Sequence, residues 1–127
     1  MVQVLLATAL LSIALGALSG FAVLAAVDYP AMLRAVGVIN PMRLRQAHMD
    51  WIIMGTVMAV TALAVPQLPG WAAALVIFGG VVNPLTFVPM AFSKKVDSTK
   101  VFRLVSFISF VSLTTGLITA AVTFIRG

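Results

Sequence analysis

Cysteine is absent from this sequence, and histidine occurs only once, at position 48. The absence of cysteine excludes disulfides, thiolate nucleophiles, zinc clusters and the C-x-x-C-H attachment of a covalent haem. Because thioethers are the only other soft side chains, a tetrahedral zinc site within one chain is not expected. His48 is therefore the one imidazole that this chain offers to a metal, and a haem iron needs only one such protein ligand.

Charged residues are scarce as well, at 9% of the 127 residues, whereas 62% are hydrophobic and the mean hydropathy is +1.17. This balance lies far from that of a soluble domain, and no polar stretch is long enough to fold as one. The composition predicts a single integral membrane domain, which we expect in the inner (cytoplasmic) membrane of a bacterium. Seven of the eight lysines and arginines gather near two connections instead of along a face, so we expect no nucleic-acid partner.

Four apolar segments are long enough to span a bilayer as helices. Their lack of period-two alternation favours helices over a membrane barrel, so we predict an all-α, integral membrane four-helix bundle. The first segment begins without a positive side chain, which favours a first span over a signal peptide. The predicted helices cover residues 2–27, 41–65, 70–92 and 101–125.

Small and hydroxylated residues recur along one face of the first and fourth spans, which predicts that these faces pack against protein. Basic residues precede the second apolar run and surround the junction of the third and fourth. The positive-inside rule then predicts that these two connections are cytoplasmic and that both termini face outward. We expect Asn40 and Pro41 to be the N-cap and first residue of the second helix.

His48 is the first candidate functional residue, because polar groups at membrane depth are costly to keep. On a helix it shares a face with Arg45, Trp51 and Gly55. Arg45 could pair with a haem propionate, and Gly55 could leave room for a flat ring. The alternative interpretation is that His48 is an interfacial polar residue near Arg45 or Asp50, and that Trp51 belongs to an aromatic belt.

Asn83 is the second candidate, since it lies within the third apolar run beside Pro84, which cannot donate to the carbonyl of Gly80. A structural hydrogen bond between helices would explain Asn83 equally well. Asp50 is the one acid expected near membrane depth, where it could accept a proton or form an interfacial ion pair.

Several short motifs together resemble a family of small four-helix membrane proteins that includes hydroxylaminobenzene mutase and styrene oxide isomerase. The likeness covers about the first three spans. The motifs are Leu18-Ser19-Gly20-Phe21-Ala22, Asn40-Pro41, Ala47-His48, Gly55-Thr56 and Val82-Asn83.

The resemblance implies a homotrimer that holds haem b between adjacent subunits, with a second-helix histidine as axial ligand. By this resemblance His48 would ligate the iron, and Asn83 would line the pocket as a catalytic residue. The ferric iron would act as a Lewis acid on a small apolar substrate, such as an epoxide or an arylhydroxylamine. The implied enzyme is an intramolecular isomerase.

Two departures and two alternatives accompany this resemblance. Met54 stands where the isomerase has an asparagine, and Phe87 stands where it has a tyrosine, so this chain lacks two polar groups of the isomerase pattern. The stretch from Arg43 to Asp50 also resembles the loop of membrane-associated glutathione transferases, although Ile53 replaces their glutamate. A non-catalytic membrane module, in which His48 is structural, is the remaining alternative.

Overall fold

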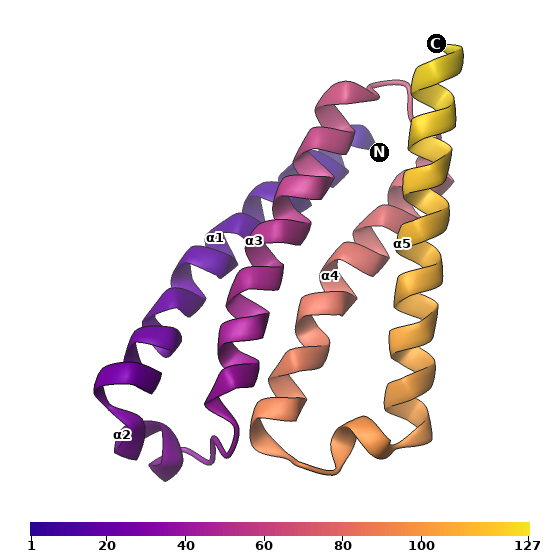
Figure 1. Ribbon diagram of the computed structural model, residues 1–127. Coiled ribbons are helices and arrows are strands. Elements are labelled where there is room, and N and C mark those ends of the chain that lie inside the picture. Colours follow the sequence, from indigo (N-terminus) through magenta and orange to yellow (C-terminus); the bar gives the residue numbers. More distant parts are fainter.

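The computed structural model describes residues 1–127 and contains helices but no strand (Figure 1). Four of the helices are long and apolar enough to cross a membrane, so this is a membrane protein of the all-helical class, as predicted. The predicted bounds of these four helices each lie within one residue of the observed ones. The elements are α1 (Val2–Asp28), α2 (Pro30–Ala35), α3 (Pro41–Ala64), α4 (Gly70–Phe92), the 3-10 turn η1 (Val96–Ser98) and α5 (Lys100–Arg126).

The four long helices follow one another as a row, α1 against α3, α3 against α4 and α4 against α5 (Figure 1). Both termini lie at one end of the molecule, and α2 and η1 lie at the other (Figure 1). The two connections that carry most of the basic residues therefore share one end, as the charge pattern requires. A buried apolar cluster that includes Leu5, Met58, Val76 and Ala120 joins all four long helices near the terminal end.

The contact of α1 with α3 is close enough for backbone to approach backbone. A Cβ atom built on Gly16 would lie 2.5 Å from Cγ1 of Ile52, and one built on Gly55 would lie 2.9 Å from the carbonyl oxygen of Ala9. Ser12 and Gly16 are buried in this contact, so the small-residue face predicted for the first span does pack against protein. Such close approach favours dispersion contacts that bulkier residues would prevent.

The contact of α4 with α5 is built in the same way. A Cβ on Gly79 would lie 2.8 Å from the carbonyl oxygen of Ser109, and one on Gly116 would lie 3.0 Å from that of Ala72. The Ser109 hydroxyl also donates a hydrogen bond of 3.2 Å to the Gly79 carbonyl. The small-residue face predicted for the fourth span is thus also packed against a neighbouring helix.

The short helix α2, which the sequence did not lead us to expect, lies in the connection between α1 and α3. It begins at Pro30, and the chain then turns at Gly37, whose φ of +96° favours glycine. Backbone amides of Ile39 and Asn40 donate to the carbonyl of Ala91 at 2.8 and 3.1 Å, which holds this connection against the end of α4. Asn40 occupies the N-cap position of α3 as predicted, but its side chain makes no capping hydrogen bond.

Replacing Gly55 by alanine should destabilise the fold by about 1–3 kcal/mol, because the new methyl group would overpack the contact with α1. At an uncrowded position inside a helix, replacing glycine by alanine usually stabilises the protein. At Gly55 we therefore expect the opposite effect on stability. Gly70→Ala is the matched control, since a Cβ there would meet only Met1, at an ordinary 3.6 Å. Unfolding in detergent measures both variants, and equal stability of the two would contradict the packing described here.

Candidate functional site

The single imidazole is held by α1. Nδ1 of His48 lies 2.6 Å from the carbonyl oxygen of Gly16 and 3.2 Å from the hydroxyl of Ser19. A carbonyl oxygen only accepts hydrogen bonds, so Nδ1 carries the hydrogen and donates it to Gly16. The Ser19 hydroxyl donates to the same carbonyl at 2.7 Å. In the neutral ring, Nε2 therefore carries the lone pair.

Nε2 of His48 is accessible from outside the chain. It has no hydrogen-bond partner, whereas every fully buried side-chain nitrogen or oxygen has one, so Nε2 reaches the surface. Gly20 leaves space beside the ring, since a Cβ there would lie 3.3 Å from Cε1. None of the five main cavities is lined by His48, so a large ligand on Nε2 would lie on the outer surface of one chain.

Arg45, Trp51 and Gly55, which we expect from the sequence to bind a cofactor together with His48, do not form one site with it. The expectation that Gly55 leaves room for a flat ring is wrong, because Ile13 and Ala9 of α1 fill the space beside it. Trp51 is buried in the same helix contact, with 8% of its surface exposed, and is therefore no open belt residue. Arg45 is exposed and lines a separate cavity.

Asp50 and Asn83 form a second polar contact, on the opposite side of α3. Nδ2 of Asn83 donates to Oδ2 of Asp50 at 3.1 Å, and this bond joins α4 to α3. At about 100° per residue, Asp50 points about 200° around α3 from His48. One chain therefore does not bring His48 and Asn83 into one pocket, and the partner of Asp50 is an amide instead of the cation that an interfacial ion pair would need.

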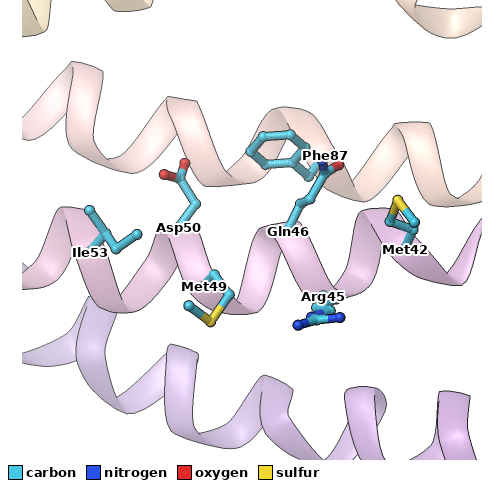
Figure 2. A pocket seen from close by; sticks show the side chains of 7 residues that line it. All are labelled: Met42, Arg45, Gln46, Met49, Asp50, Ile53 and Phe87. Carbon is cyan, nitrogen blue, oxygen red and sulfur yellow. The ribbon is translucent and has the colours of Figure 1, made fainter.

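A cavity of about 390 Å³ opens on the side of α3 that carries Asp50 (Figure 2). Figure 2 shows Asp50 and Gln46 extending from α3 toward α4, where Phe87 stands opposite them. Oδ1 of Asp50 has no hydrogen-bond partner and is not buried, and Asp50 is one of the residues that line this cavity. The lining residues are Met42, Arg45, Gln46, Met49, Asp50, Ile53 and Phe87.

The cavity could not be predicted from the sequence, although its lining residues follow a simple pattern. Met42, Gln46, Met49 and Ile53 recur at spacings of three and four, which places them on one face of a helix. That spacing also fits lipid-facing or core residues, so it does not by itself point to a cavity. Phe87, noted only as a departure from the isomerase pattern, proves to be its wall on α4.

Comparison with protein-family models, with curated proteins and with solved structures yields no match for this chain. The resemblance to the isomerase and mutase family therefore rests on its short motifs alone.

Replacing Asn83 by alanine should destabilise the fold by about 1–2 kcal/mol, because Asp50 loses its only side-chain partner in an apolar setting. Asn40→Ala is the matched control: it removes the same amide group from a side chain that makes no capping hydrogen bond. Detergent unfolding of both variants gives the comparison. An Asn83 variant as stable as the Asn40 variant would show that the contact contributes nothing.

Proposed function

We propose that this chain is a membrane haem b protein in which Nε2 of His48 is the axial ligand. The observation that carries the proposal is the hydrogen bond from Nδ1 to the carbonyl of Gly16. Metal-ligating histidines almost always donate their other ring N–H in this way, which fixes the tautomer and orients the free nitrogen. The accessible, partnerless Nε2 has the lone pair that such a ligand requires.

The cofactor in this proposal lies between adjacent chains of a homotrimer. Support comes from the absence of His48 from every main cavity of the single chain, since a haem on Nε2 then needs a second surface to cover it. Gly16, Ser19 and Gly20 of α1 would orient the imidazole and leave space beside it. Trp51 and Gly55, both packed against α1, have no part in the proposed site.

Arg45 remains the proposed partner of a haem propionate. It is exposed near the start of α3, where the basic connections of the chain lie, and its guanidinium suits a carboxylate. A haem held by His48 would supply a ferric iron with Lewis-acid character. The proposed reaction is the isomerisation of a small apolar molecule, an epoxide or an arylhydroxylamine, and it rests on the family resemblance.

Within one chain, neither Asn83 nor Phe87 supplies a polar group beside His48 for the proposed isomerisation. Asn83, the residue that the resemblance marks as catalytic, is hydrogen-bonded to Asp50 on the side of α3 remote from His48. It could reach the iron face only from a neighbouring chain. Phe87 presents a ring where the isomerase has a hydroxyl, so no phenol is available at this position to donate a proton.

A second candidate function is a non-catalytic membrane module in which His48 is structural. The same hydrogen bond favours it, because donation from Nδ1 to Gly16 joins α3 to α1 whether or not Nε2 binds a metal. The haem function requires Nε2 of His48 as the iron ligand, whereas the structural function requires only Nδ1.

Two substitutions of His48 separate these functions. Asparagine can place its amide nitrogen where Nδ1 donates, but it has no counterpart of Nε2, whereas alanine lacks both. We expect protein purified after expression with ample haem to show a Soret band that is lost in both His48→Asn and His48→Ala and kept in Ser19→Ala. We also expect His48→Asn to be more stable than His48→Ala, because the asparagine variant keeps the bond to α1.

The outcome that would overturn the haem proposal is a wild-type protein without a Soret band, or a band unchanged in both His48 variants. A haem-free protein in which His48→Asn keeps the wild-type stability and oligomeric state would instead support the structural role.

A further inference from the structure

We infer that the cavity beside Asp50 binds lipophilic amines in their ammonium form, with Oδ1 of Asp50 as the anchoring group. This site lies on the face of α3 opposite to His48 and does not depend on the proposed haem. Its ligand class follows from the charge, the hydrogen bonding and the apolar lining of the cavity.

The carboxylate of Asp50 is incompletely satisfied by the chain. Only Oδ2 has a partner, the neutral amide of Asn83, while Oδ1 is accessible and unpartnered on a residue that lines the cavity. A carboxylate within a spanning helix is costly unless a cation or several donors compensate it. An ammonium group entering the cavity would supply both the opposite charge and the missing hydrogen-bond donors.

The other walls of the cavity suit the apolar body of such an amine. Phe87 faces Asp50 from α4 (Figure 2), so an ammonium group at Oδ1 would also lie near the face or edge of an aromatic ring. Met42 and Met49 are flexible and polarizable, and such side chains adapt to ligands of different shape. The volume of about 390 Å³ lies in the range of cavities that hold small organic ligands.

The positive charge of Arg45 distinguishes a cationic from an anionic ligand in this cavity. Arg45 lines the same cavity but stands on the side of α3 turned away from Phe87 (Figure 2), and no hydrogen bond joins it to Asp50. The two residues are five positions apart, a spacing that does not bring side chains together on a helix. A cationic ligand would therefore be attracted by Asp50 and repelled by Arg45, whereas an anionic ligand would show the reverse.

The test is calorimetric titration of the protein, prepared without haem in an uncharged detergent, with 4-phenylbutylamine and with its neutral counterpart 4-phenylbutan-1-ol. We expect the amine to bind more tightly than the alcohol. Asp50→Asn should weaken amine binding by about tenfold or more, and Arg45→Gln should strengthen it by about twofold to fivefold. Asp97→Asn, which neutralises an exposed acid in η1, should leave the affinity unchanged.

Equal binding of amine and alcohol in all variants would mean partition into the micelle only and would overturn the inference. Weaker amine binding in Arg45→Gln would overturn it too, because a cation site cannot lose affinity when a neighbouring cation is removed. Because haem is left out, failure here leaves the Soret test of His48 untouched, and failure of that test leaves this one untouched.

Discussion

The close approach of α1 to α3 at Gly16 and Gly55 is the constraint on which the rest of the molecule depends. Because the two backbones are in contact, the carbonyl of Gly16 lies within reach of the His48 ring and holds it in one tautomer. α1 occupies this side of α3, and α4 packs on another side, where Asn83 meets Asp50. A bulky residue at either glycine would separate the helices and release the imidazole.

Two polar side chains of α3, His48 and Asp50, thereby lie in two different helix contacts. Toward α1, His48 donates to a backbone carbonyl and keeps a free nitrogen at the surface. Toward α4, Asp50 accepts from Asn83 and keeps a free oxygen at a cavity. In each pair one polar atom is satisfied by the fold and one is left for a ligand, which is how a costly group within a membrane is expected to be used.

Much of the fold could be predicted from the sequence, because the helices follow directly from the length of the apolar runs and from Pro41 at a helix start. The site could not. A repeat of small residues shows that a helix face is packed but not what covers it. The sequence therefore predicts room for a cofactor at Gly55, although α1 occupies that space. Likewise, the spacing of Asp50 and Asn83 in the chain carries no sign of their contact, which arises from the packing of α3 on α4.

Helix α1 fixes the imidazole of His48 with hydrogen on Nδ1 and a free lone pair on Nε2. Because the chain has only one histidine, ¹⁵N NMR of histidine-labelled, haem-free protein reads this ring alone. With the ring neutral, we expect a protonated Nδ1 and an unprotonated Nε2. A spectrum with the hydrogen on Nε2 would contradict it, since Nδ1 could then make no hydrogen bond to the carbonyl of Gly16.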